Sequence, residues 1–496
     1  MDDKTKNFLR QIDQKADEIK ARILCAEDAL CVPGTKYFVS ADGDDDNDGL
    51  SESTPWKSLK KVSDAPLESG DGVFFKRGDL FRGCVYAKEG VSYGAYGSGE
   101  KPRIYGWDYS LAHPLLWECV GDNIYKLKNK ILDAGTLVFN HGEKHSRKLI
   151  PSFVHGEFVC RDNPEKKFDL KAEMTQNLDL WCRYDERTTT AYSKGENFAV
   201  PIMDENSYGD LYLRCDEGNP GEVFDSIEAL TRRPGFLVGD KKDVRIDNIC
   251  LKYIGHHAIA AGGKSVEGLT VTNCEIGWIG GTVQHYNGTD PNFPKGRRGS
   301  VTRFGNGVEI YGGCKDYAVE NCYIYQVYDA AVTHQITTCG QTFVMENVVY
   351  ANNLIEECVY SIEYFLDMTD GDEQSYMKNI QMSGNVLRRC GYGWGQQRHN
   401  KDTPAHIKGW DYQNVAYDYR IENNVFDRSA YRMVHIVAKE EKHLPVLNGN
   451  VYIQNENYLL GQFSSLDDIK IIDFDENASD VIREKLGDKN ATVIVL

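Results

Sequence analysis

Two glutamates, Glu309 and Glu363, each lie inside a short apolar stretch, in the segments Val308–Ile310 and Ile362–Tyr364. Because side chains alternate across a β-strand, apolar neighbours that point into a core leave each glutamate on the opposite face. Two carboxyl groups held near each other repel, so the pKa of one rises while the other stays ionised. That division is what general acid and base catalysis needs, and we treat both glutamates as candidate catalytic residues.

Three further polar residues belong to the same pattern. His435 lies between Val434 and Ile436, Asp329 enters the strand between the two glutamates, and Asp367 closely follows Glu363. We expect Asp329 and Asp367 to complete the group of candidate catalytic carboxylates. On the intervening strands, we expect Thr333 and either Gln396 or Gln397 to continue the line of outward side chains.

A recurrent asparagine indicates how these strands are arranged. Asparagine precedes a short apolar strand at intervals of 25, 48, 32, 32, 39 and 26 residues, at Asn248, Asn273, Asn321, Asn353, Asn385, Asn424 and Asn450. A repeat in the mid-twenties with insertions predicts a parallel β-solenoid, in which each coil holds two or three short strands. The asparagines would form an amide ladder at one corner. A β-propeller would need ~40–50 residues and four strands per repeat, so we prefer the solenoid.

The rest of the chain divides around this repeat. Residues 1–34 hold an amphipathic helix that we expect to cap the domain, and 35–105 hold the first coils. The repeat disappears over 106–225, which predicts an inserted β-rich module, and returns over 226–465, the main coils with the catalytic face. Residues 466–496 hold an acidic helix and a last strand, a C-terminal cap. The fold class is therefore all-β, a solenoid with an inserted module and short capping helices.

Composition excludes several classes of partner. The 496 residues carry a formal net charge of −18, which disfavours nucleic acid and anionic membranes. The 14 cysteines show no CxxC pair, so we expect mostly buried free thiols. No secretory signal is evident at the N-terminus, and we expect a cytoplasmic protein. A homo-oligomer remains open.

We expect no cofactor and no metal. The acidic turn 42–49 superficially resembles an EF-hand loop, but the ligand spacing fails. Calcium at this turn or at 367–372 is the remaining alternative.

Several segments resemble right-handed parallel β-helix carbohydrate-active proteins of the pectate-lyase-like superfamily. They are Tyr37–Gly43, Asn47–Gly49, Thr54–Leu59, Gly70–Asp79, Gly305–Tyr311 and Tyr328–Gln335. The resemblance covers roughly residues 37–465 and implies a right-handed parallel β-helix. It is most similar to the glycoside hydrolases among these proteins and implies an oligosaccharide substrate. The same superfamily also contains polysaccharide lyases, epimerases and binding proteins.

In such a helix, coils stack at ~4.8 Å, so Glu309 and Glu363, two coils apart, would have backbones ~10 Å apart. Their carboxyls could reach the ~6.5–9.5 Å that an inverting glycosidase requires. Polar and aromatic residues on successive coils are predicted to bind the sugar, namely His334, Gln335, Tyr364, Arg398, His406, Lys408, Trp410 and His435. Insertions at 282–303 and 398–410 are expected to wall the cleft.

We therefore predict an exo-acting glycoside hydrolase that cleaves a short oligosaccharide by paired-carboxylate chemistry. One alternative is a polysaccharide lyase or uronate epimerase, for which Lys408, Arg398 and His406 could supply a base and a cation. Another alternative is a noncatalytic carbohydrate-binding β-helix.

Overall fold

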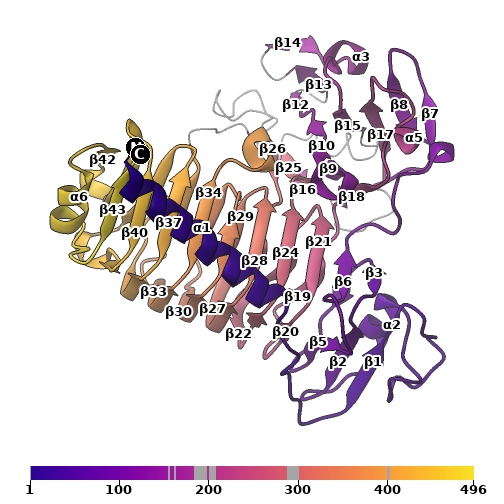
Figure 1. Cartoon of the computed structure of the whole chain (residues 1–496), viewed down its shortest axis with the longest axis horizontal. Helices are drawn as coiled ribbons and strands as arrows, with labels where there is room; N and C mark the ends of the chain where they lie inside the picture. Colours follow the sequence, from indigo (N-terminus) through magenta and orange to yellow (C-terminus); the bar gives the residue numbers. More distant parts are fainter. Residues whose placement is uncertain are drawn as a thin grey trace.

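The computed structural model describes residues 2–154, 157–160, 163–183, 198–199, 208–286, 301–398 and 403–496. Three stacks of parallel strands run along the molecule, and the chain passes from one stack to the next in each coil (Figure 1). The predicted all-β fold, a parallel β-helix, is confirmed. Its interior is one continuous hydrophobic core that extends from Val39 to Ala491.

The first stack, here called the site sheet, carries the candidate carboxylates. Its strands are β4 (Val85–Tyr86), β19 (Phe236–Gly239), β22 (Ile259–Glu267), the first half of β27 (Val308–Glu320), β29 (Ala330–Thr337), β32 (Tyr360–Asp367), β35 (Ala405–Gly409), β38 (Arg432–Ala438) and β41 (Tyr458–Ser465). Every neighbouring pair in this stack is parallel, so side chains at equal register form rows perpendicular to the strands.

The second stack, here called the helix sheet, lies under the N-terminal helix. Its strands are β3 (Leu80–Arg82), β6 (Arg103–Tyr105), β21 (Cys250–Ile254), β24 (Glu275–Ile279), β28 (Tyr323–Val327), β31 (Leu354–Glu356), β34 (Val386–Cys390), β37 (Val425–Ser429), β40 (Val451–Gln454) and β43 (Thr492–Val495). The third stack closes the coil with β1 (Lys36–Val39), β2 (Gly72–Lys76), β5 (Ser92–Tyr96), β20 (Arg245–Asp247), β23 (Thr270–Thr272), the second half of β27, β30 (Val344–Ala351), β33 (Tyr376–Ser383), β36 (Ala416–Glu422) and β39 (Val446–Asn448).

The N-terminal helix α1 (Asp3–Leu24) runs along the flank of the coils (Figure 1). Its buried face, Ile12, Ala16, Ile19 and Ile23, packs on outward apolar residues of β28, β31, β34, β37 and β40. We predicted a helix that caps an end of the stack, and this placement corrects that expectation. The helix sheet presents apolar side chains on the outer face of successive coils, and a helix laid across the coils covers that row.

An asparagine ladder occupies one corner, as predicted, but it is shorter than the repeat suggested. The side chains of Asn353, Asn385, Asn424 and Asn450 are linked by Nδ2–H···Oδ1 hydrogen bonds of 2.9–3.1 Å, and Asp488 ends the row. The three earlier asparagines, Asn248, Asn273 and Asn321, instead adopt positive φ angles between 52° and 62° one residue before the ladder position. They therefore serve the turn itself, which asparagine tolerates better than most residues.

The inserted module is built mainly of antiparallel strands. One sheet contains β7 (Trp117–Cys119), β8 (Ile124–Leu127), β11 (Arg147–Lys148), β15 (Asp179–Arg183) and β17 (Asp210–Arg214), and a second contains β12 (Ser152–Val154), β13 (Glu157–Cys160) and β14 (Asn163–Lys167). The strands β9 (Ala134–Phe139) and β18 (Ile227–Thr231) connect the module to the helix sheet, because β18 pairs with both β9 and β21. The strand β10 (Lys144–His145) extends this edge.

The C-terminal segment closes the far end of the stack. It contains α6 (Ala478–Asp480) and the helical turn η7 (Val481–Lys485), followed by β43, which pairs with β40. Ala478 and Ile482 are buried in the main core, so this segment covers the last coil.

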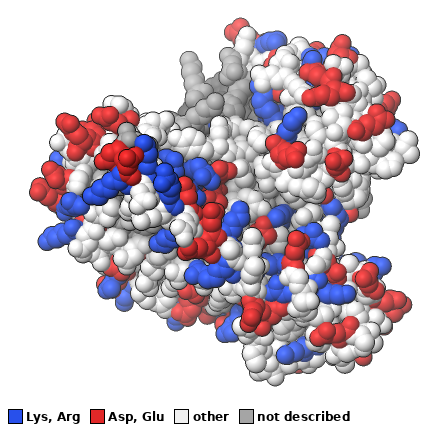
Figure 2. Space-filling model, in the orientation of Figure 1, with Lys and Arg blue, Asp and Glu red and all other residues white. Residues whose placement is uncertain are grey.

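The 14 cysteines are free thiols, most of them buried. Among the described residues, no helix combines the length and the hydropathy that a bilayer span requires. Acidic and basic side chains are interspersed on the face that carries α1, so neither sign dominates this face (Figure 2).

Candidate functional site

One row of side chains crosses the site sheet at equal register. It consists of Glu309, Thr333, Glu363, Lys408, His435 and Gln462, on β27, β29, β32, β35, β38 and β41. The predicted alignment of Glu309, Glu363 and His435 is confirmed. The coil between Glu363 and His435 is occupied by Lys408, and the expectation that Gln396 or Gln397 fills it is wrong, because both belong to the 3-10 helix η4 (Trp394–Gln397).

Glu309 is buried, and its carboxylate is bound by amide donors. Asn306 donates a short hydrogen bond to Oε2, and Gln335 Nε2 lies 3.3 Å from both carboxylate oxygens. His257 Nδ1 lies 3.9 Å from Oε2. Burial raises the pKa of Glu309 to about 7, although the two amide donors favour the charged form.

Glu363 has a more strongly raised pKa. The indole Nε1–H of Trp410 donates to Oε1 at 2.6 Å, and only 4% of the residue is exposed. Burial, followed by the negative charge of Asp329, raises the pKa of Glu363 to about 8. A carboxyl group with this pKa carries a proton at neutral pH, which is the state that a general acid requires.

Asp329 forms an ion pair with Arg398, which reaches it from the segment that follows η4. Burial raises the pKa of Asp329, while the charge and hydrogen bond of Arg398 oppose that rise. Neither glutamate of the row has an Arg or Lys ion pair among the described contacts. Asp329 is therefore the carboxyl group of this cluster that is best kept ionised.

A basic group continues the row beyond Glu363. Lys408 Nζ lies 2.5 Å from Nδ1 of His435 and 3.8 Å from the ring centroid of Trp410, and Nε2 of His435 lies 2.7 Å from Asp411. Burial, followed by the nearby Arg432, lowers the pKa of Lys408 to about 7. Burial also lowers the pKa of His435 to about 4, so a neutral ring can donate from Nε2 to Asp411 and accept at Nδ1.

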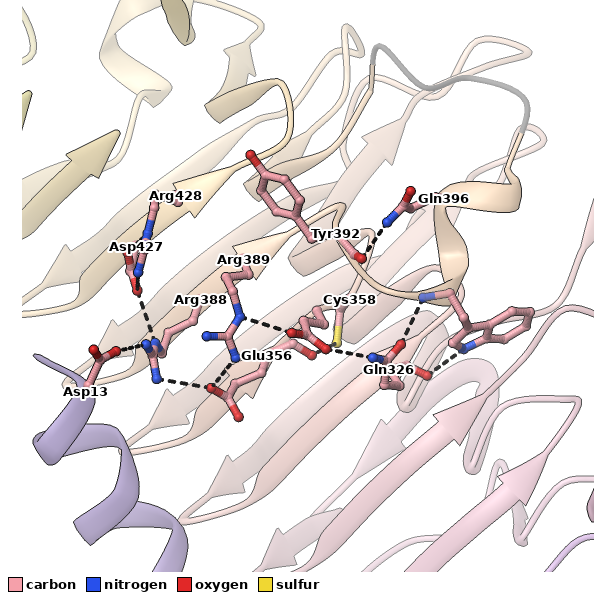
Figure 3. A network of polar contacts seen from close by, with 12 residues as sticks. Asp13, Gln326, Glu356, Cys358, Arg388, Arg389, Tyr392, Gln396, Asp427 and Arg428 are labelled. Atoms are coloured by element: carbon pink, nitrogen blue, oxygen red, sulfur yellow. Dashed lines mark hydrogen bonds and ion pairs between the residues drawn. The ribbon is translucent and has the colours of Figure 1, made fainter. Parts of the chain in front are cut away.

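The helix η4 that precedes Arg398 is fixed to the helix sheet by a chain of polar contacts (Figure 3). The side-chain Oε1 of Gln326 accepts a hydrogen bond from the Trp394 backbone N–H at 2.8 Å. The backbone carbonyl of Gln326 accepts one from the Trp394 indole N–H at 2.7 Å. The side-chain amide of Gln326 also donates to Glu357 at 2.6 Å, and Glu357 accepts from Arg389 at 3.0 Å. The neighbouring Arg388 is within reach of Glu356, Asp427 and Asp13 of α1. The segment that places Arg398 beside Asp329 is thus held on the helix sheet by hydrogen bonds and ion pairs.

Three predicted sugar-binding residues are inside the coil instead. His334 and Tyr364 stack on each other with ring centroids 5.7 Å apart, and His334 Nδ1 lies 2.9 Å from the hydroxyl of Tyr350. His406 is fully buried, 3.2 Å from the Ser361 hydroxyl and against the ring of Phe426. These positions contradict the expectation that the three side chains contact a substrate, because the core encloses them.

Asp367 is also apart from the cluster. It lies four residues beyond Glu363 on β32, which is ~13 Å along a strand, and accepts a hydrogen bond from Thr337 at 3.2 Å. The structure therefore does not bring it to the other candidate carboxylates. Of the remaining predicted residues, Gln335, Arg398, Lys408, Trp410 and His435 do lie around Glu309, Asp329 and Glu363.

Sequence reasoning missed several residues of the site. Asn306 precedes Glu309 by three residues, in the segment Gly305-Asn306-Gly307. Nothing in this segment indicated that the Asn306 side chain donates a hydrogen bond to Glu309. On β32, Tyr360 is on the same face as the core residues Ile362 and Tyr364. Its ring nevertheless lies edge-on to Trp410 and under Arg398. Asp411 follows Trp410 directly but contacts a histidine 24 positions away, which only the tertiary structure reveals.

The two predicted wall insertions fall partly on residues 287–300 and 399–402, which lie outside the described part of the chain. Within the described residues, no group of three or more His, Cys, Asp or Glu side chains is arranged to hold a metal ion. The expectation that no cofactor is needed stays a prediction.

Comparison with known proteins gives one short match in sequence. No family model matches the chain. A stretch of 51 residues is 53% identical to a lacto-N-biosidase from Bifidobacterium longum subsp. longum, and this match covers 10% of the chain and 3% of that relative.

Solved structures resemble the chain over most of its length. A GH136 lacto-N-biosidase from Eubacterium ramulus matches with a TM-score of 0.40 and 14% identity, covering 91% of this chain and 63% of that protein. A XylC structure in complex with xylose matches with a TM-score of 0.45 and 11% identity, covering 93% and 83% respectively. The predicted resemblance to carbohydrate-active proteins is thus confirmed as a likeness.

Proposed function

We propose that the chain is a glycoside hydrolase that cleaves an oligosaccharide at the row of carboxylates on the site sheet. The observation that carries this proposal is that Glu309, Asp329 and Glu363 form one cluster, in which Arg398 pairs with Asp329 and neither glutamate has an Arg or Lys ion pair among the described contacts. Such a separation of acid from base is what glycoside hydrolysis requires. The stretch of the chain that is 53% identical to a lacto-N-biosidase supports the same class of reaction.

Glu363 is the proposed general acid. It would donate its proton to the oxygen of the leaving sugar as the glycosidic bond breaks. Asp329, kept ionised by Arg398, would act at the anomeric carbon, either by taking a proton from the attacking water or by attacking directly. Glu309, with its pKa near 7, would hold hydroxyl groups of the sugar together with Gln335.

The residues around the cluster suit a sugar. The partly exposed indole of Trp410 offers a face for the apolar side of a pyranose, and Lys408 and His435 add polar groups beside it. We further propose exo action on a short chain, which a time course of product lengths would test, because exo action releases a single small product from the first turnovers.

A uronate lyase or epimerase is the second candidate. Lys408 favours it, because a buried amine whose pKa is lowered to about 7 can act as a base at neutral pH. Against it, the nearby cation Arg398 is already committed to Asp329 and His406 is enclosed in the core. A noncatalytic sugar-binding role needs no proton donor at the cluster, so measured turnover would exclude it.

Incubation with a panel of neutral and uronate-containing oligosaccharides tests the proposal. We expect new reducing ends from at least one neutral oligosaccharide, and none from the Glu363→Gln variant. Ultraviolet absorbance from an unsaturated uronate would contradict hydrolysis and favour a lyase. Saturable binding without turnover across the panel would contradict catalysis.

A further inference from the structure

A large cavity separates the inserted module from the coils. Its volume is about 900 Å³, near the upper end of the usual range for small-molecule sites. One wall comes from the module, around β10, β11 and Phe168, and the other from η4 and the residues before it. Gln397 joins the walls at one side, because its amide donates to the Ser146 carbonyl at 2.7 Å and accepts from the Lys148 backbone N–H at 3.1 Å.

The lining is polar and aromatic rather than apolar. Phe168, partly exposed, presents its ring from the module, and Gln396 is exposed on η4. His145 lies beside Gln397, with its Nδ1 3.2 Å from the amide nitrogen of Gln397. Amide, imidazole and aromatic groups of this kind pair with the hydroxyls and the apolar faces of sugars.

Each basic side chain in this lining already has a carboxylate partner. Arg147 binds Asp179 at 2.7 Å and Lys166 binds Glu173 at 2.8 Å, while Lys148 pairs with Asp133 and Arg398 with Asp329. Asp133 and Lys148 are both buried. Because these pairs neutralise the cations, the described part of the lining offers no surplus positive charge to an anionic sugar.

Arg398 connects the cavity to the carboxylate cluster. It lines the cavity and also binds Asp329, the proposed partner of Glu363. The hydrogen bonds of Gln326 to Trp394 and Glu357 hold η4, which directly precedes Arg398, on the helix sheet (Figure 3). We propose that the cavity is a subsite for the sugar units of the substrate that lie beyond the cleaved bond, and that these units are uncharged. This inference rests on the proposed function for its location next to a cleaved bond.

Binding measured by calorimetry in a Glu363→Gln background tests the subsite without turnover. The ligands are a neutral disaccharide, the neutral tetrasaccharide that extends it, and a tetrasaccharide of equal length that contains uronates. Gln396→Trp fills the cavity from the coil wall, and Phe168→Ala removes the aromatic surface of the module wall. Gln341→Trp, at an exposed glutamine in the loop between β29 and β30, is the matched control.

We expect the neutral tetrasaccharide to bind about tenfold more tightly than the disaccharide. Gln396→Trp and Phe168→Ala should each remove most of that gain while leaving disaccharide affinity and the melting temperature unchanged, and Gln341→Trp should remove none of it. A gain that survives both cavity variants, tighter binding of the uronate ligand, or no binding of any ligand would overturn the inference. If the wild-type protein hydrolyses nothing but the length-dependent gain is present and lost in both variants, the proposed function fails and the cavity stands as a binding site for neutral sugar units without a cleaved bond beside it.

Discussion

Glu309 of β27 and Glu363 of β32 occupy the same register position on the site sheet, with Thr333 of β29 between them. Two strand spacings set their backbones ~10 Å apart. Asp329 lies at the corner before β29. The negative charge of Asp329 raises the pKa of Glu363 more than the negative charge of Glu309 does. The parallel stacking of the coils thus brings together carboxyl groups that are widely separated in sequence.

Removing Arg398 should shift the acid limb of the activity profile. Asp329 must be ionised to act, so activity falls as pH drops through its pKa, and Arg398 lowers that pKa. In Arg398→Met we expect the acid limb to move up by ~1–3 pH units, measured as kcat/KM against pH. Arg233→Met, which breaks an ion pair with Asp108 in another part of the molecule, is the control. An unchanged acid limb would show that Asp329 is not the ionised group.

Trp410→Phe should shift the alkaline limb of the pH–activity profile. The indole N–H favours the charged form of Glu363, and phenylalanine keeps a ring near Lys408 but removes that donor. Glu363 must be protonated to act as the acid, so activity is lost as pH rises through its pKa. We expect the alkaline limb to move up by about half a unit or more and kcat to fall about tenfold. A downward move would contradict the assigned role of the indole.

The raised pKa of Glu363 predicts a pH-dependent stability. The unfolded chain releases this proton near the ordinary value of 4.5, and the folded chain near 8. The contribution of Glu363 to the free energy of unfolding is therefore fully present below about pH 4.5, and it is lost as the pH rises towards 8. Glu363→Gln removes the titration, so its melting temperature should exceed that of the wild type by ~2 °C or more at pH 8 and match it at pH 5. An equal difference at both pH values would indicate a packing effect.

The asparagine ladder should support the coils without affecting the reaction. Asn385 bonds to Asn353 on one side and to Asn424 on the other, and its amide also donates to the Tyr350 carbonyl at 2.8 Å. Asn385→Leu leaves these buried partners unsatisfied, at a cost of about 1–3 kcal/mol in the free energy of unfolding. Chemical denaturation should show this loss, with kcat intact at low temperature. Asn490→Ala, at an exposed position, should cost little by comparison.

The repeat of asparagines predicted the fold because a solenoid imposes the same turn on every coil. It did not predict the flank position of α1, which depends on the outer face of the helix sheet. In Asn248-Ile249 an apolar residue, and in Asn321-Cys322 a cysteine, takes the ladder position after the turn asparagine. The amide ladder is therefore shorter than the repeat.

Strand alternation predicted the outward placement of Glu309, Glu363 and His435 for a local reason, since neighbours in one strand fix each side chain's face. The same alternation turns His334 and Tyr364 inward. We predicted that both bind the sugar because their side chains are polar, but their strand positions place them in the core. The pairing of Arg398 with Asp329 joins residues 69 positions apart, so no local pattern reports it.

The most direct test of the account asks whether Glu363 protonates the leaving group. Once the panel has identified a substrate, kcat/KM of Glu363→Gln is compared on that oligosaccharide and on an aryl glycoside of the same sugar whose phenol leaves without protonation. Glu456→Gln, at an exposed glutamate, is the control. We predict a loss of about 10²–10⁴ on the oligosaccharide and less than about tenfold on the aryl glycoside. Equal losses on both substrates, or near-wild-type activity on the oligosaccharide, would contradict the assignment.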